Sequence, residues 1–155
     1  MRIYLVAIGQ RLDAWVNQGY QEYARRLPPE CQLHLVEVAP NKRTKNTDPR
    51  RVIDEEGERL LAAVPANARI LTLDAQGRQW STEQLAEHLR EWLSGGRDVA
   101  LLAGGPDGLS QRCRDRAEGS VALSKLTFPH PLVRIIIAEQ LYRATTILKG
   151  HPYHR

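Results

Sequence analysis

Five short, nearly continuous apolar runs divide the chain and constrain its fold more than any other feature. They are rich in β-branched residues and lie at Ile3–Ile8, Leu33–Val38, Arg69–Leu73, Val99–Ala103 and, more weakly, Ser120–Leu123. Continuous apolar runs of this length are typical of strands that are buried on both faces, as in parallel sheets. The runs therefore predict a mostly parallel sheet of about five strands.

Helical patterns fill the intervals between these runs. We expect helices at about Leu12–Leu27, Pro49–Val64, Ser81–Leu93, Ser110–Ala117 and Pro131–Leu148. The third opens with Ser-Thr-Glu-Gln, the signature of a capping box. Alternating strands and helices favour an α/β fold with flanking helices. Because 155 residues is close to the usual size of one domain, we expect residues 1–155 to form a single domain.

Composition excludes several classes of protein. The formal net charge of +4 permits a polyanionic partner without requiring one. Cys31 and Cys113 are the only cysteines and lie far apart, which indicates neither a disulfide framework nor a thiolate zinc site. No metal is expected, since His151 and His154 have no carboxylate or thiol close by in the sequence. The first apolar run is too short for a signal peptide and no run could span a membrane, so a cytoplasmic location is expected.

The last helical segment carries apolar residues on two stripes. Val133, Ile137, Leu141 and Leu148 form one, while Ile135, Ala138 and Tyr142 form another, separated by Arg134 and Thr145. A helix that covers one sheet needs only one stripe. The second stripe is explained either by a second copy of the chain, which we favour, or by a neighbouring helix of the same chain.

Three connections that follow strands carry the best candidates for a ligand site. They are Leu73-Asp74, the glycine turn that begins at Gly104, and the apolar stretch Leu123–Phe128. Ligands of open α/β sheets bind at the carboxyl ends of the strands. No P-loop and no dinucleotide fingerprint is present, so an apolar crevice for an adenosine-like group fits better than a triphosphate site.

The segment from Ala39 to Asp48 is basic and carries Lys42, Arg43 and Lys45. A solvated loop is one interpretation of such a cluster. The other is an arm that contacts phosphates without reading sequence.

Taken together, these motifs resemble the RlmH (YbeA) family of SPOUT-class methyltransferases, which modify N3 of a pseudouridine in 23S ribosomal RNA. The resemblance spans the chain and rests on GGPDG, LSKLTFPHPLVRIIIAEQLYRA, HPYHR, NKRTKN and DEEGERL. One departure is Asn41, where relatives commonly carry a glycine, and it bears on the flexibility of the basic segment. The resemblance implies a C-terminal trefoil knot, a homodimer and S-adenosylmethionine as methyl donor. The cofactor-binding residues that it implies are Leu73, Gly104, Leu123, Ser124, Lys125, Leu126, Thr127 and Phe128.

Methylation of N3 requires removal of its proton. We expect His154 to act as the base, Arg155 to stabilise the developing anion and Tyr153 to contact the nucleobase, while His130 is a further RNA-binding candidate. By itself, HPYHR would be taken for a frayed terminus, and the prolines beside His130 for helix punctuation. The expected substrate is the assembled 70S ribosome, because a small, modestly basic dimer favours recognition of shape. The alternatives are a non-enzymatic ribosome-binding factor and a flavodoxin-like nucleotide or flavin protein.

Overall fold

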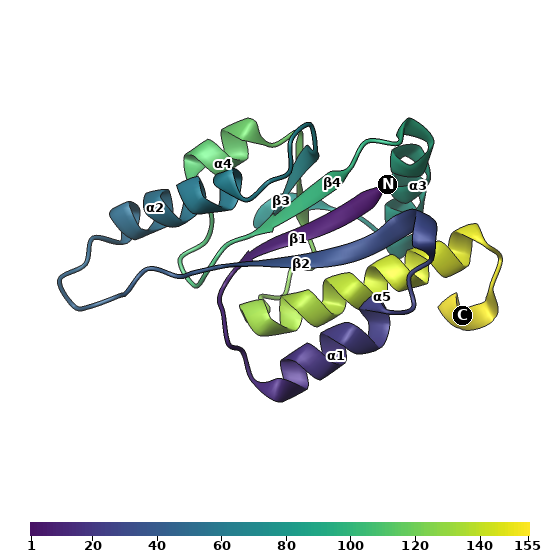
Figure 1. Ribbon diagram of the computed structural model, residues 1–155, viewed down its shortest axis with the longest axis horizontal. Helices are drawn as coiled ribbons and strands as arrows, with labels where there is room; N and C mark the ends of the chain where they lie inside the picture. Colours follow the sequence, from purple (N-terminus) through teal and green to yellow (C-terminus); the bar gives the residue numbers. More distant parts are fainter.

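The predicted parallel sheet is present, and its five strands lie in the order β2-β1-β4-β3-β5. The computed structural model describes residues 1–155 (Figure 1). The strands are β1 Arg2–Ile8, β2 Gln32–Val38, β3 Arg69–Gln79, β4 Val99–Ala103 and β5 Gly119–Ala122. Every strand pairs in parallel with its neighbours, and Ile3 of β1 lies opposite both Leu33 of β2 and Val99 of β4.

The five predicted helices are also confirmed, with ends that shift by a few residues. They are α1 Ala14–Ala24, α2 Pro49–Ala62, α3 Thr82–Gly95, α4 Gln111–Arg116 and α5 His130–Leu148. Short 3-10 turns, η1 Pro29–Cys31 and η2 Pro152–His154, complete the elements. The capping box of α3 forms as predicted, because Ser81 Oγ accepts from the Gln84 amide at 3.1 Å and Gln84 Oε1 accepts from the Ser81 amide at 2.8 Å. None of the helices is long and apolar enough to cross a membrane.

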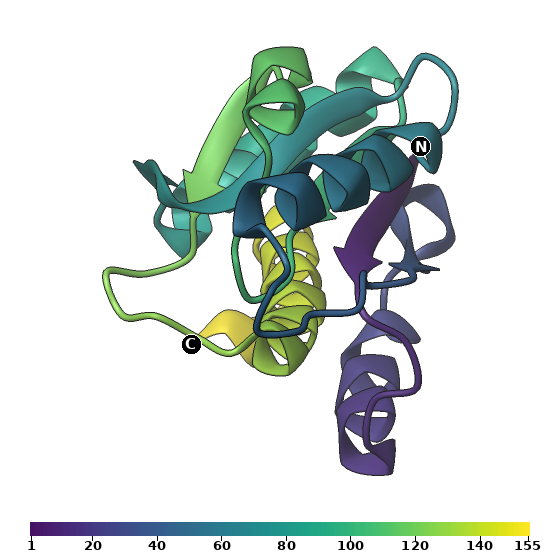
Figure 2. The same cartoon turned by 90° about the vertical axis from the view of Figure 1, so that its left-hand side faces the viewer.

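Helices cover both faces of the sheet, which explains the continuous apolar runs. Figure 1 shows α2 and α4 on one side and α1 and α5 on the other, and Figure 2 gives the same layers from the end. Along β1, Ile3 and Leu5 face the core beneath α1, α3 and α5, while Val6 and Ile8 face the core beneath α2 and α4. Alternate residues therefore enter two different cores.

Strand β3 is longer than predicted. It pairs with β4 only as far as Leu73, then continues to Gln79, and Val121 of β5 lies opposite both Leu73 and Arg78. The polar residues after Leu73 had indicated a loop, but they belong to an irregular extension of the strand. Gly77 is needed there, since a Cβ at this position would lie 2.7 Å from the backbone of Ser120.

Both apolar stripes of helix α5 pack within its own chain, with Ile137, Ala138 and Leu141 buried and the other stripe residues partly buried. Arg134 and Thr145, predicted to separate the stripes, are 1% and 5% exposed. Ala138 is in the core, and Ile135 packs on α1, where a Cβ at Gly19 would lie 2.8 Å from Ile135 Cδ1. The neighbouring-helix interpretation therefore accounts for these residues, and the stripes alone do not require a second copy.

Both thiols are buried and neither forms a disulfide. Burial raises the pKa of Cys31 to about 11 and also raises the pKa of Cys113. Both side chains pack as small apolar groups.

Candidate functional site

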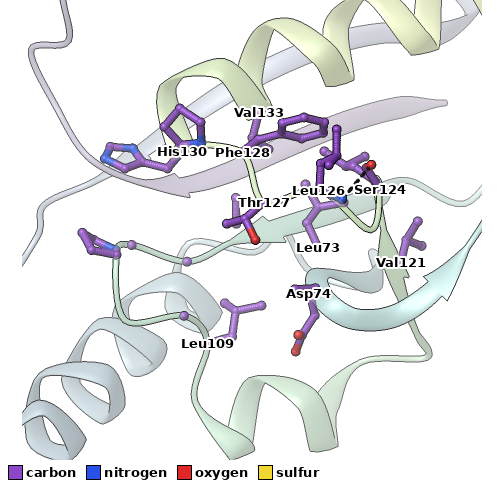
Figure 3. Close-up of a pocket in the computed structure, with 18 of the residues that line it drawn as sticks. Leu73, Asp74, Leu109, Val121, Ser124, Leu126, Thr127, Phe128, His130 and Val133 are labelled. Atoms are coloured by element: carbon purple, nitrogen blue, oxygen red, sulfur yellow. Dashed lines mark hydrogen bonds between the residues drawn. The ribbon is translucent and has the colours of Figure 1, made fainter.

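The three predicted connections meet at one cavity, beside the carboxyl ends of β4 and β5 and the point where β3 stops pairing with β4 (Figure 3). Its volume is about 560 Å³. Except for Lys125, which is exposed and outside it, every residue predicted to bind the cofactor lines this cavity: Leu73, Gly104, Leu123, Ser124, Leu126, Thr127 and Phe128. The topology therefore brings together segments that are about fifty residues apart in the sequence.

The GGPDG turn after β4 forms one wall of the cavity and depends on its glycines. A Cβ at Gly104 would lie 2.5 Å from the carbonyl oxygen of Gly108, so only glycine fits. Gly108 has a φ of +85° and its amide donates to the Gly105 carbonyl at 3.0 Å. The turn thus presents backbone, without side-chain bulk, to a ligand.

The segment between β5 and α5 forms the opposite wall. Ser124 Oγ accepts from the Leu126 amide at 3.0 Å and shapes the turn. Leu126 is 72% exposed, whereas Leu123 and Phe128 are half-buried. Because Leu126 lines the cavity beside Phe128, its exposed side chain offers a surface on which an apolar part of a ligand would pack.

An ion pair between Asp74 and Arg114, which the sequence did not predict, lies at the edge of this cavity. Arg114 Nε of α4 donates to Asp74 Oδ2 at 2.6 Å, and Asp74 Oδ1 accepts from the Gln76 amide at 3.0 Å. Burial alone would raise the pKa of Asp74, but these two hydrogen bonds hold it below its ordinary value. Asp74 had been noted only as part of a connection, and no feature of the sequence indicated Arg114.

Arg134 ties the N-terminal part of α5 to the sheet. Its guanidinium donates to Glu37 Oε2 of β2 at 2.8 Å and to the Gly9 carbonyl, after β1, at 2.9 Å. This places His130 in the lining of the cavity, where its Nδ1 is buried without a hydrogen-bond partner. Burial, followed by the positive charges of Arg134 and Arg43, lowers the pKa of His130, so the imidazole is neutral at pH 7.

The basic segment lies outside the cavity lining, and its cations have different environments. Lys42 and Lys45 are exposed and form no ion pair. Arg43 instead pairs with Glu56 at 2.9 Å and with Asp107 at 2.8 Å. The side chain of Asn41 hydrogen-bonds to Glu55 and Arg59 of α2. Asn41 therefore anchors the start of the segment on α2.

The predicted catalytic residues Tyr153, His154 and Arg155 do not line this cavity. Tyr153 OH donates to Glu139 Oε1 at 3.2 Å, and its ring is tilted by 57° against that of Tyr142, with the ring centroids 4.6 Å apart. Glu139 is nine residues after His130, which is about 14 Å along a helix axis. The Nδ1 atom of His154 is buried without a partner. Figure 1 shows the C-terminus at the end of α5 that is remote from the cavity.

A second, more apolar cavity of about 420 Å³ shares a wall with the first. Leu73, Leu123 and Phe128 line both cavities. The second cavity extends to Trp80, which follows β3, and to Ile136 on the flank of α5. No group of three side chains with metal-ligating chemistry occurs in the protein.

Comparison with known proteins gives concordant matches over the whole chain. The family model described as predicted SPOUT methyltransferase matches residues 1–154. A Ribosomal RNA large subunit methyltransferase H from Methylococcus capsulatus is 62% identical over 155 residues, covering 100% of both chains. Proteins of the same name from Thioalkalivibrio sulfidiphilus and Nitrosococcus oceani are 54% and 53% identical, covering 100% of this chain and 99% of theirs.

Proposed function

Since this chain belongs to the SPOUT methyltransferase family, we propose that it methylates N3 of a pseudouridine in large-subunit (23S) ribosomal RNA, with S-adenosylmethionine as donor. The observation that carries the proposal is the convergence of Leu73, Gly104 and Leu123–Phe128 on one cavity. Relatives that match this chain over 99–100% of their length carry the name Ribosomal RNA large subunit methyltransferase H.

The cavity fits a cofactor with an apolar ring and a polar sugar. Leu126 and Phe128 offer apolar surface, the Gly104–Gly108 turn offers backbone groups, and the ionised Asp74 can accept hydrogen bonds from hydroxyls. When bound, S-adenosylmethionine supplies an electrophilic methyl group on a sulfonium. No metal is required for such a displacement, and the main task of the protein is to hold the base in line and exclude water.

The chain must also remove the N3 proton of the pseudouridine. We assign this step to His154, with Arg155 stabilising the negative charge that develops on the ring and Tyr153 holding the nucleobase. The buried Nδ1 of His154 has no partner, which leaves it free of any structural hydrogen bond. His130, at the cavity itself, contacts the RNA as a neutral imidazole.

This assignment requires a homodimer, in which the tail of one protomer reaches the cavity of its partner. The separation of the tail from the cavity of its own chain supports that arrangement. So does the second apolar cavity on the flank of α5, a surface suited to a partner helix or tail. The trefoil knot, a matter of chain threading, stays a prediction from the family.

Lys42, Arg43 and Lys45 form the RNA-facing edge beside the cavity, and the exposed Lys42 and Lys45 contact phosphates directly. A patch this small is better suited to recognising the shape of an RNA than its nucleotide sequence. The substrate is therefore the assembled 70S ribosome, and the enzyme works in the cytoplasm. A non-enzymatic ribosome-binding factor would use the same segment but would have no need for the cofactor cavity.

The test is incubation of the protein with labelled S-adenosylmethionine and either naked 23S RNA or 70S ribosomes that contain pseudouridine. We expect one methylated nucleotide, mapped by mass spectrometry to N3 of a pseudouridine, on ribosomes and not on naked RNA. Ribosome binding without methyl transfer, and without heat on mixing with S-adenosylmethionine, would favour the binding factor instead.

A further inference from the structure

The guanidinium of Arg43 is engaged inside the protein although it belongs to the basic segment. Its Nε donates to Asp107 Oδ2 at 2.8 Å and one terminal nitrogen donates to Glu56 Oε1 at 2.9 Å. The side chain is 30% exposed. Two carboxylates already balance its charge, so a phosphate could bind Arg43 only by displacing one of them.

Glu56 anchors the start of the basic segment on α2. Its side chain is 2% exposed, and both oxygens are used by the segment: Oε1 by Arg43 and Oε2 by the Asn41 amide at 2.9 Å. A buried carboxylate is stable only with such partners. The geometry of residues 41–43 is therefore tied to a rigid helix.

Asp107 belongs to the GGPDG turn that forms a wall of the cavity. The guanidinium also packs on the backbone of that turn, because a Cβ at Gly105 would lie 3.2 Å from the Arg43 terminal nitrogen and 3.5 Å from Glu56 Oε1. One side chain thus joins α2, the basic segment and the turn, and it does so without lining the cavity.

We propose that Arg43 is a positioning residue that couples the cofactor turn to the basic segment, so that binding of S-adenosylmethionine orders residues 41–47 for contact with RNA. The coupling rests on the proposed binding of S-adenosylmethionine in this cavity. It is reciprocal, so an RNA phosphate held by Lys42 or Lys45 strengthens cofactor binding in turn. Arg43 contributes by holding the segment in place rather than by binding phosphate.

Amide hydrogen exchange on the full-length protein tests this coupling. In wild type, we expect S-adenosylmethionine to slow exchange several-fold in residues 41–47 as well as in residues 123–128. In Arg43→Gln, the slowing in 41–47 should disappear while that in 123–128 remains. Arg90→Gln, which removes an exposed arginine paired with Glu87 on α3, is the matched control and should behave as wild type. Retention of the wild-type slowing in Arg43→Gln overturns the proposal.

A double-mutant cycle provides a second test, because it adds a variant on the more exposed side of the Arg43 contacts. Asp107 is 38% exposed, so Asp107→Asn should fold normally. By calorimetry, we expect Asp107→Asn and Arg43→Gln each to weaken S-adenosylmethionine binding. The double variant should bind the cofactor no more weakly than the more affected of the two single variants. If the double variant instead shows the product of the two single losses of affinity, the coupling is contradicted. Absence of binding in wild type would defeat the proposed function itself, whereas normal binding without slowing in 41–47 defeats only the role of Arg43.

Discussion

The two ends of helix α5 are held in different ways. At its N-terminal end, the fully buried Arg134 is bonded to groups that follow β1 and lie on β2, and His130 lines the cavity. At its C-terminal end, the tail folds back onto the helix through Tyr153 and the half-buried Glu139, and Arg143 lies 5.0 Å from the Tyr153 ring. The N-terminal end is hydrogen-bonded to the sheet, whereas the tail that follows the C-terminal end hydrogen-bonds to α5.

This difference agrees with the roles proposed above for the two ends. A cofactor site needs fixed walls, and the N-terminal end obtains them from the sheet of its own chain. Groups that must meet a substrate held elsewhere need an accessible surface, which the tail provides. The comparison leads to five predictions, in order of expected size.

Removal of residues 153–155 should give the largest effect. The tail lines no part of the cavity, so we expect the single-turnover methylation rate to fall roughly 10³-fold while the affinity for S-adenosylmethionine stays within about 2-fold of wild type. Quench-flow measurements on ribosomes and calorimetry with the cofactor would separate the two quantities. If cofactor affinity falls together with the methylation rate, the tail contributes to cofactor binding and the two ends do not have separate roles.

Mixing two impaired variants, at a cofactor concentration too low to saturate Leu126→Asp, extends this test to the dimer. Protomers without residues 153–155, exchanged with Leu126→Asp protomers, should regain roughly a quarter of wild-type activity, because half of the dimers then hold one complete site out of two. No recovery after verified subunit exchange would mean that the tail acts on its own cavity.

Leu126→Asp should weaken S-adenosylmethionine binding by roughly 10- to 100-fold, the value of one buried leucine side chain. Trp15→Ala is the matched control, since Trp15, 55% exposed, is the other large apolar side chain on the surface and does not line the cavity. Isothermal titration should show the loss for Leu126 alone. Equal affinities for both variants would exclude Leu126 from the cofactor wall.

Two arginine substitutions compare the stability of the ends. Arg134→Met leaves the Gly9 carbonyl and Glu37 without their donor and should lower the free energy of unfolding by about 2 kcal/mol. Arg143→Met removes a partly exposed pair with Glu139 and should cost less than about 1 kcal/mol. Urea unfolding of both variants measures the difference, and similar costs would contradict the contrast between the ends.

The smallest effect is a pH dependence at His130. Burial and the nearby Arg134 and Arg43 lower its pKa below the ordinary value of 6.5, so the unfolded chain binds the proton more readily than the folded chain. The contribution of this group to stability should therefore decrease as pH falls below 6.5, and His130→Gln should remove that part of the dependence. An NMR titration with a pKa at or above 6.5 would contradict this.

Most of the fold could be predicted because local patterns agree with it. Runs buried on both faces and the capping box of α3 each identify their element without knowledge of the rest of the chain. The extension of β3 could not be predicted, because Asp74, Gln76 and Arg78 are polar and depend on pairing with a strand that follows much later. The partner of the second stripe of α5 could not be predicted for the same reason, since the helix that packs on it, α1, lies far away in the sequence.

The convergence of the three predicted connections on one cavity is confirmed, whereas ion pairs between distant elements were not predicted. The cavity residues follow β4 and β5 or lie where β3 stops pairing with β4, positions that the topology fixes. The pairing of Asp74 with Arg114 joins residues forty positions apart, and charge type alone selects no partner among 22 basic residues. The engagement of Arg43 by Glu56 and Asp107 was hidden similarly, since all three belong to segments that look exposed in the sequence.

The burial of Cys31 and Cys113 makes the protein a convenient background for thiol chemistry. Their raised pKa values leave little thiolate at neutral pH, so maleimide or disulfide reagents should spare both. A cysteine introduced at Arg155 would then be the single reactive thiol of each protomer. Spin labels or fluorophores attached there could follow the position of the tail on the ribosome throughout the catalytic cycle.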